Sequence, residues 1–283
     1  MLECVVNVAE GRDAPVLSRL ATACGDTLLD LHADADHHRS VFTLAGPGPR
    51  DAVWAAASLT RAAVADLDLG SHEGVHPRLG VVDVVPFVAL DEPAEVAVDA
   101  AREFAARIAA ELAIPVFLYG AADPGGRDLP SVRRDAFRRR PPDLGPSGPN
   151  PRWGATAVGA RPPLVAVNCW LDRDDLAVAQ SVAGTVRERN GGLPGVRALG
   201  FRLPSTGHVQ VSMNVTDLAA TSVEAACEAV ARAAATAGAN VARVEWVGLV
   251  PVEAIDRCSP GFRSWSGLDH SRSIENRLAV RSG

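Results

Sequence analysis

The sequence contains no lysine, so all 28 of its basic side chains are arginine. This absence excludes every mechanism that needs a lysine, namely a Schiff base, a lysine nucleophile or the lysine of a phosphate-binding loop. The net charge of −6 over 283 residues argues against general binding to nucleic acid. The sequence also has no apolar run near the roughly 20 residues of a membrane span, so no membrane partner is expected.

Cysteines are few, and their pattern is uninformative for metal binding. The five are odd in number, widely spaced and free of any CxxC pair, so we expect reduced thiols and no cysteine-based zinc site. The N-terminus has no basic segment followed by an apolar one, so we expect no signal peptide and a cytoplasmic location. An apolar fraction of 47 % with 22 % charged residues predicts a globular protein with a sizeable core.

One order of strands and helices occurs twice along the chain. In the first repeat we predict strands over residues 2–10, 27–34, 40–46 and 81–90, and helices over 13–24 and 50–66. A further helix over 92–112 and a strand over 115–120 follow it. In the second repeat we predict strands over 164–171, 196–203, 208–215 and 241–250, and helices over 174–190 and 221–237. Two β-α-β-β-α-β units predict an α/β (α+β) fold of two ferredoxin-like subdomains.

The composition changes between the two repeats. We predict an N-terminal subdomain over residues 1–120, a connecting segment rich in Pro, Gly and Arg over 121–162, and a C-terminal subdomain over 163–283. The connecting segment could be a plain linker. It also carries Trp153, a large apolar surface that needs a partner, and long loops in compact proteins are often functional. A ligand-binding role for residues 145–156 therefore stands beside the linker interpretation.

A short stretch before the strand at 81–90 combines groups that suit proton transfer. It reads SHEGVHPRLGVVDVVPF over residues 71–87, with His76 followed by Pro77 and Arg78. An imidazole has an ordinary pKa near 6.5, so it can hold or release a proton at neutral pH. Pro77 restricts the backbone of His76 to extended conformations, which helps to fix it. His76 is therefore a candidate general acid–base, although a lone histidine is more often a hydrogen-bonded loop residue.

Metal binding is the alternative use of these histidines. His72 and His76 are four residues apart and would share a face on a helix, with His37 and His38 as further ligands. Gly74 and Pro77 interrupt any such helix, and the sequence has no HExxH motif. We therefore expect no metal.

Other polar residues stand where a ligand could reach them. Asn7 and Glu10 end the first strand and could contact a ligand or make turn hydrogen bonds. Arg39 opens the third strand and could bind a carboxylate or remain solvated. Asn214 stands between apolar residues of a strand, where an amide needs a partner if it is buried.

Motifs along nearly the whole chain resemble the formiminotransferase family. They are, in order, ECVVNVAEG, DHHRSVFTLAGP, SHEGVHPRLGVVDVVPF, PVFLYG, GPSGPNPRWGATAVGAR, VQVSMNVTD and VGLVPVEAI, running from residue 3 to about residue 255. The resemblance implies two similar α/β subdomains with a folate-binding groove between them. It also implies transfer of a formimino group from N-formimino-L-glutamate to N5 of tetrahydrofolate, without a metal.

Roles for particular residues follow from the resemblance. His76 matches the catalytic histidine of the family's HPR-G motif. A loop that binds folate in the family matches Gly145, Pro146, Ser147, Gly148, Pro149, Asn150, Pro151, Arg152, Trp153 and Gly154. Apart from the resemblance, their residue types and positions make Asn7, Glu10, Arg39, Arg78 and Asn214 candidates for contact with the substrate. We further expect a homodimer whose other partners are small molecules alone, and a chain too short to include a cyclodeaminase domain.

The expected chemistry suits these groups. N5 of the folate attacks the amidine carbon to give a tetrahedral intermediate, and glutamate then leaves as an amine, which requires a proton. One positioned imidazole can move that proton, typically for about 10²–10⁴-fold in rate. Both substrates carry carboxylates, which suits an arginine-rich groove in an acidic protein.

The chain departs from the family pattern at several positions, namely His32, His38, Ala136, Arg138 and Pro162. His32 and His38 replace an acid and an amide, Ala136 and Arg138 replace two acidic residues, and Pro162 replaces a lysine. These changes leave His76 in place and alter its surroundings. Two alternatives therefore stay open: transfer involving another amine, such as glycine or a specialised metabolite, and a non-catalytic folate-binding relative.

Overall fold

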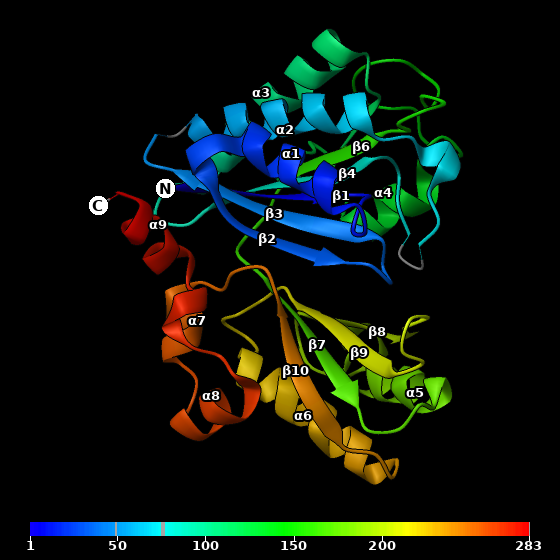
Figure 1. Cartoon of the computed structure of the whole chain (residues 1–283), viewed down its shortest axis with the longest axis vertical. Coiled ribbons are helices and arrows are strands. Elements are labelled where there is room, and N and C mark those ends of the chain that lie inside the picture. Colours follow the sequence, from blue (N-terminus) through cyan, green and yellow to red (C-terminus); the bar gives the residue numbers. More distant parts are fainter. Residues whose placement is uncertain (49, 75–76, 283) are drawn as a thin grey trace. The chain divides into compact units, whose positions relative to one another are not determined.

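The computed structural model describes residues 1–48, 50–74 and 77–282, and it divides into two compact units, Met1–Pro162 and Pro163–Gly283 (Figure 1). Each unit has its own sheet and its own hydrophobic core. His76, the predicted acid–base group, lies outside the described residues, whereas the residues on both sides of it, up to Gly74 and from Pro77, are described.

The first unit is built on one mixed sheet with the strand order β2-β3-β1-β4-β6-β5. Its strands are β1 (Leu2–Val8), β2 (Leu28–Asp34), β3 (Arg39–Gly46), β4 (Val82–Ala89), β5 (Val116–Gly120) and β6 (Thr156–Ala160). Its helices are α1 (Ala14–Cys24), α2 (Asp51–Asp66), α3 (Ala94–Leu112) and α4 (Leu129–Asp135), with 3₁₀ turns at Gly25–Thr27 and Leu69–Ser71. The pairs among β1 to β4 are antiparallel, and β6 pairs in parallel with both β4 and β5.

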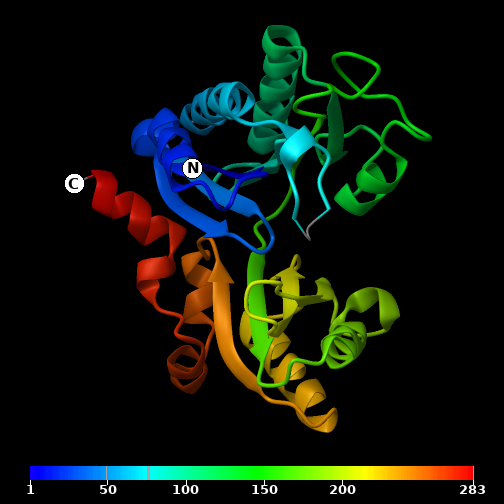
Figure 2. The same cartoon turned by 45° about the vertical axis from the view of Figure 1, so that its right-hand side comes forward.

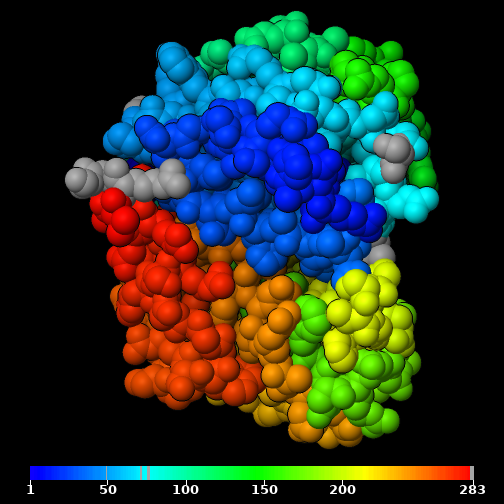
Figure 3. Space-filling view, viewed as in Figure 1, coloured from blue at the N-terminus to red at the C-terminus, as the bar shows by residue number. Residues whose placement is uncertain are grey.

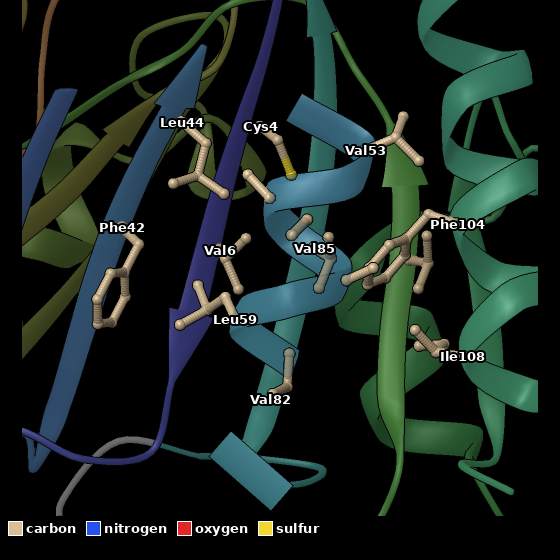
Figure 4. Packing of buried hydrophobic residues seen from close by; sticks show 14 of the residues in the cluster. Cys4, Val6, Phe42, Leu44, Val53, Leu59, Val82, Val85, Phe104 and Ile108 are labelled. Atoms are coloured by element: carbon tan, nitrogen blue, oxygen red, sulfur yellow. The ribbon is translucent and has the colours of Figure 1, made fainter. Parts of the chain in front are cut away.

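Helices α1, α2 and α3 cover one face of this sheet, and the main core lies beneath them. Figure 4 shows how Val6 and Val85 from the strands meet Leu59 of α2, while Phe104 and Ile108 of α3 pack beside them. These side chains are almost completely buried. The sheet therefore has one apolar face that is fully covered, and its polar residues face the other way.

The opposite face of the sheet carries a smaller apolar cluster beneath α4. Figure 2 shows α3 and α4 on opposite sides of β5. Val132 of α4 packs in it with Phe117, whose ring meets Phe137 edge-on at 4.9 Å between centroids. Asp128 caps α4 by accepting the backbone N–H of Ser131 at 3.0 Å. This packing fixes the short helix on the same side of the sheet as the polar residues of β1, β3 and β4.

The second unit has an antiparallel sheet with the strand order β10-β7-β9-β8. Its strands are β7 (Val165–Leu171), β8 (Val196–Arg202), β9 (Val209–Val215) and β10 (Val241–Val247). Helices α5 (Leu176–Val186) and α6 (Val223–Thr236) cover one face of it, and a 3₁₀ turn at Glu188–Asn190 comes directly after α5. The chain continues through α7 (Val252–Asp256), α8 (Pro260–Ser266), a 3₁₀ turn at His270–Arg272 and α9 (Ile274–Ser282). In Figure 3 the residues after about 252, in orange-red to red, form part of this unit's surface.

The predicted fold class is confirmed. Both sheets contain a β-α-β-β-α-β unit with the strand order of a ferredoxin-like fold, and every predicted strand and helix of the two repeats is present with shifted ends. The largest shift concerns the helix predicted over 174–190, which ends at Val186. α4, β6 and the C-terminal helices were not predicted from the sequence. Part of the segment 121–162 belongs to the first sheet, because β6 pairs with β4 and β5.

The five cysteines are buried thiols in the structure, and burial raises the pKa of Cys24 to about 12. None of the helices within the described ranges combines the length and apolarity that crossing a membrane requires.

Candidate active site

A buried carboxylate on β4, that of Asp83, is the point where three parts of the first unit meet. The side chain is fully buried. One oxygen, Oδ1, accepts the backbone N–H of Leu79 at 2.8 Å. The other, Oδ2, lies 2.5 Å from Nη1 of Arg39 and 2.5 Å from Nη2 of Arg133. Both oxygens therefore have charged or backbone donors, as a buried carboxylate requires.

The charge state of Asp83 follows from these neighbours. Burial by itself would raise the pKa of Asp83, but the charges of Arg39 and Arg133 and the hydrogen bonds from Arg133 and Leu79 outweigh it. The pKa of Asp83 is therefore held below its ordinary value, and the group is an anion at neutral pH.

Asn7 holds the other side of the Arg39 guanidinium. Its Oδ1 accepts from Nε of Arg39 at 3.0 Å and from Nη2 at 2.8 Å, and its Nδ2 donates to the carbonyl of Val5 at 3.1 Å. Asn7 is on the central strand β1, between β3 and β4, where it pairs with Val41 and Val84. Arg39 thus bridges two polar residues on the sheet face opposite the main core.

The residues just before the undescribed pair 75–76 are held by His38. Its Nδ1 donates to the carbonyl of Glu73 at 2.8 Å, and its Nε2 lies 3.3 Å from Oε1 of Glu10. The His72 ring stacks on the His38 ring with centroids 4.0 Å apart, and Nε2 of His72 donates to the carbonyl of His38 at 2.9 Å. His38 itself has a left-handed backbone, with φ of 48°.

Glu10 links this contact to the start of α1. Its Oε1 also accepts the backbone N–H groups of Arg12 at 2.6 Å and Asp13 at 2.9 Å. Burial tends to raise the pKa of Glu10, but these backbone donors and the neighbouring His38 lower it overall. Burial is also the largest influence on His72, and it lowers the pKa of the imidazole. The His72 ring is therefore neutral near pH 7 and packs as a structural group.

The residues just after the undescribed pair are held from the other side. Nη1 of Arg133 donates to the carbonyl of Pro77 at 2.9 Å, and the N–H of Leu79 donates to Asp83 as described above. Nη2 of Arg78 donates to the carbonyl of His72 at 2.6 Å, which joins the two sides of the loop. The described residues on both sides of 75–76 are thus tied down by side chains.

The segment predicted to bind folate lies along this loop. The N–H of Leu69 donates to the carbonyl of Arg152 at 2.7 Å, and the N–H of Val81 donates to that of Trp153 at 3.1 Å. Gly80 and Gly154 form an isolated bridge at the closest point. Gly154 has φ of 67°, and a Cβ on it would lie 2.2 Å from the carbonyl oxygen of Leu79. Only glycine allows this approach.

The two halves of the predicted folate segment differ in their surroundings. Residues 146–149 are exposed. In the second half, the Asn150 side chain accepts the N–H groups of Arg152 and Trp153, and the backbones of Asn150 and Gly154 bond to each other. These backbone donors are therefore used inside the loop. Trp153 is partly buried against the main core of the first unit, with the Arg152 guanidinium 5.7 Å from its ring centroid.

The structure brings most of the predicted site residues together in the first unit. Four of them lie around the described residues 72–74 and 77–81, namely Asn7, Glu10, Arg39 and Arg78. Arg39 donates to Asn7 and to Asp83. Glu10 accepts a backbone N–H group, and Arg78 donates to a backbone carbonyl. Their predicted contact with substrate stays a prediction. Asn214 is on β9 of the second unit, where its side chain is exposed. Its backbone is in register with Arg197 of β8.

Sequence reasoning did not identify Asp83 or Arg133. Asp83 had a usable signal, because it is a lone charge inside the apolar strand VVDVVPFVAL and such a charge needs a partner. Arg133 had none, because it is one of five arginines in RRDAFRRR and only the packing of α4 singles it out. The role of His38 was also missed, since it was considered as a metal ligand and as a departure from the family pattern, and not as a partner of Glu73.

Of the histidines considered for a metal site, His76 lies outside the described residues, and the other three are engaged in protein contacts. Nδ1 of His37 lies 2.7 Å from Oδ2 of Asp34, and His38 and His72 bond as described above. Within residues 1–48, 50–74 and 77–282, no three His, Cys, Asp or Glu side chains are grouped so that they could hold a metal ion.

Comparison with known proteins identifies this arrangement. Residues 1–161 match the N-terminal subdomain of the formiminotransferase domain, and residues 168–266 match the formiminotransferase domain. The chain belongs to the formiminotransferase family. It is 36 % identical to the glutamate formimidoyltransferases of Streptococcus pyogenes serotype M1 and Thermoplasma acidophilum, over 98 % of this chain and 98 % and 97 % of those proteins.

A second kind of relative is larger. The formimidoyltransferase-cyclodeaminase of Sus scrofa is 34 % identical over 90 % of this chain but only 51 % of its own length. These likenesses show that the chain is a transferase enzyme of the formiminotransferase family, matching the part of that larger protein that lacks the cyclodeaminase.

Two departures from the family pattern fall in different surroundings. Ala136 is 8 % exposed and packs in the small cluster under α4 with Val132 and Phe117, where a carboxylate would displace apolar contacts. Arg138 is exposed just beyond the helix. The departure at Ala136 therefore changes the apolar packing beneath α4. The departure at Arg138 changes the charge on the protein surface beside this helix.

Asp83 makes the stability of the first unit depend on pH. We predict that Asp83→Asn lowers the free energy of unfolding by about 3–5 kcal/mol at pH 7, because Arg39 and Arg133 lose a buried counter-charge. A carboxyl with a lowered pKa in the folded state stabilises above its unfolded pKa of about 3.9, and this contribution is lost as pH falls through the folded pKa. The difference between the two proteins should therefore shrink below about pH 4.

Urea denaturation of both proteins at pH 7 and in steps down to pH 3 measures this difference. A constant difference across that range would contradict the account of Asp83 as a buried anion.

Proposed function

We propose that the chain transfers a formimino group from N-formimino-L-glutamate to N5 of tetrahydrofolate, with His76 as the general acid–base. The observation that carries the proposal is the match over 98 % of the chain to two proteins named glutamate formimidoyltransferase. The loop around His76 supports it, because general acid–base catalysis needs the proton-transfer group at a fixed point and both described flanks of the loop are anchored.

In the proposed reaction the two substrates exchange bonds, and the protein moves the protons. N5 of tetrahydrofolate forms a bond to the amidine carbon of formiminoglutamate, and the N5 proton is released. The tetrahedral intermediate then breaks its bond to the glutamate nitrogen, which takes up a proton and leaves as the amine. His76 accepts the first proton and supplies the second, so the sum needs no external oxidant or reductant.

We assign folate binding to the segment Gly145–Gly154, which lies against the backbone of residues 69 and 79–81. This contact would hold the pterin beside the loop that carries His76. Holding two substrates together lowers the entropic part of the barrier. The proposal includes a homodimer and a cytoplasmic location.

The test of the transfer is a substrate screen. Purified protein with tetrahydrofolate and formiminoglutamate should yield 5-formiminotetrahydrofolate and glutamate by mass spectrometry. In a parallel reaction, formiminoglycine should react far more slowly. A faster reaction with formiminoglycine would favour the alternative amine, which is worth testing because Ala136 replaces an acidic residue. No product with either substrate would support a non-catalytic folate-binding protein.

The same assay tests His76. His76→Ala should lower kcat by about 10²-fold or more with the KM of both substrates nearly unchanged, because proton transfer is lost and binding groups are kept. His72→Ala should cost less. His270→Ala is the matched control, since His270 is exposed and pairs with Asp256 in the second unit. A His76→Ala enzyme with more than half of wild-type turnover would remove His76 from the mechanism.

Trp153 tests the folate segment. We expect Trp153→Ala to weaken tetrahydrofolate binding by about 1–3 kcal/mol, the usual scale for an aromatic contact at a site, with a smaller effect on formiminoglutamate. Calorimetric titration of folate into both proteins measures the change. Because Trp153 also packs on the core, Trp54→Ala, at an exposed position of α2, serves as the control. Equal affinities of wild type and Trp153→Ala would mean that Trp153 only packs the first unit.

A further inference from the structure

Arg133 makes two contacts, one with the backbone of residue 77 and one with the buried carboxylate of Asp83. Its Nη1 donates to the carbonyl of Pro77, and its Nη2 donates to Asp83, whose other oxygen holds the N–H of Leu79. A guanidinium is a rigid planar fork, so its two contacts fix each other's position. The backbone on both sides of Arg78 is thus tied to one buried pair of charges.

Both residues of this ion pair, Arg133 and Asp83, are on regular elements of secondary structure. Arg133 extends from α4, which is capped by Asp128 and packed through Val132 on the apolar cluster above β5 and β6. Asp83 is on the central strand β4 and is fully buried. The contact therefore connects residues 77–79 to two regular elements and not to another loop.

The packing leaves Arg133 free of a role in the core. Its side chain is 19 % exposed, and Asp83 keeps Arg39 as a second counter-charge. Removing Arg133 would not leave a buried charge alone, so the cost falls on the position of Pro77 and not on the fold. The side chain of Arg134, the next residue, is 62 % exposed, and among the described residues its hydrogen-bond and ion-pair partner is the adjacent Asp135.

We propose that Arg133 is a positioning residue that acts through Asp83 and Pro77 to fix the residue joined to Pro77, His76, for proton transfer. The inference rests on the proposed role of His76. A shift of a reacting group by about 1 Å can cost 10²-fold in rate, so a lost anchor one peptide bond away is a kinetic effect and not a binding effect.

The experiment compares Arg133→Ala, Arg133→Lys and the control Arg134→Ala. Arg133→Ala should lower kcat by about 10- to 100-fold with KM values for both substrates within about twofold of wild type. Arg133→Lys should recover part of the loss, because an ammonium keeps the charge beside Asp83 but cannot hold both partners in a fixed fork. Arg134→Ala should match wild type.

Hydrogen exchange separates this inference from the proposed function. In Arg133→Ala the amides of residues 78–81 should exchange at least about threefold faster than in wild type, while β1 and α3 keep their protection. If wild type lacks transfer activity, the proposed function fails and exchange still tests the anchor. If Arg133→Ala keeps wild-type kcat, or exchanges at 78–81 as slowly as Arg134→Ala, the positioning role is wrong.

Discussion

The buried carboxylate of Asp83 is the interaction on which the candidate site depends. A charge inside a protein is tolerated only when its oxygens are satisfied, and here β3, α4 and the loop at 77–79 each supply a donor. Because Asp83 bonds all three, it brings together segments that are about 40 to 50 residues apart in sequence. The loop after His76 takes its position from this requirement.

A consecutive pair of residues, His38 and Arg39, serves the two sides of that loop. His38 holds Glu73 on the N-terminal flank, and Arg39 reaches the C-terminal flank through Asp83. The left-handed backbone at His38 belongs to the turn that presents both side chains at the start of β3. In the family pattern an amide commonly stands at the position of His38, so this chain holds the N-terminal flank with an imidazole and a stacked partner, His72.

The regular elements of both repeats could be predicted because their apolar residues follow the strand and helix periods over enough residues. The missing elements lacked that signal. β6 has five small residues buried on both faces and shows no alternation, and α4 is a seven-residue helix among arginines whose apolar contact is mainly Val132. For the site, motifs located the loop and the residues around it. The partners of Asp83 depended on long-range packing, which no local pattern records.

The central claim is that the anchor at Arg133 and Asp83 acts through His76. A double-mutant cycle tests it most directly, with kcat for formimino transfer measured in wild type, His76→Ala, Arg133→Ala and the double variant. Once the imidazole is gone, its position no longer matters. The account therefore predicts that Arg133→Ala lowers the kcat of His76→Ala by less than about threefold. If Arg133→Ala costs the same factor with and without His76, the two residues act independently and the claim is contradicted.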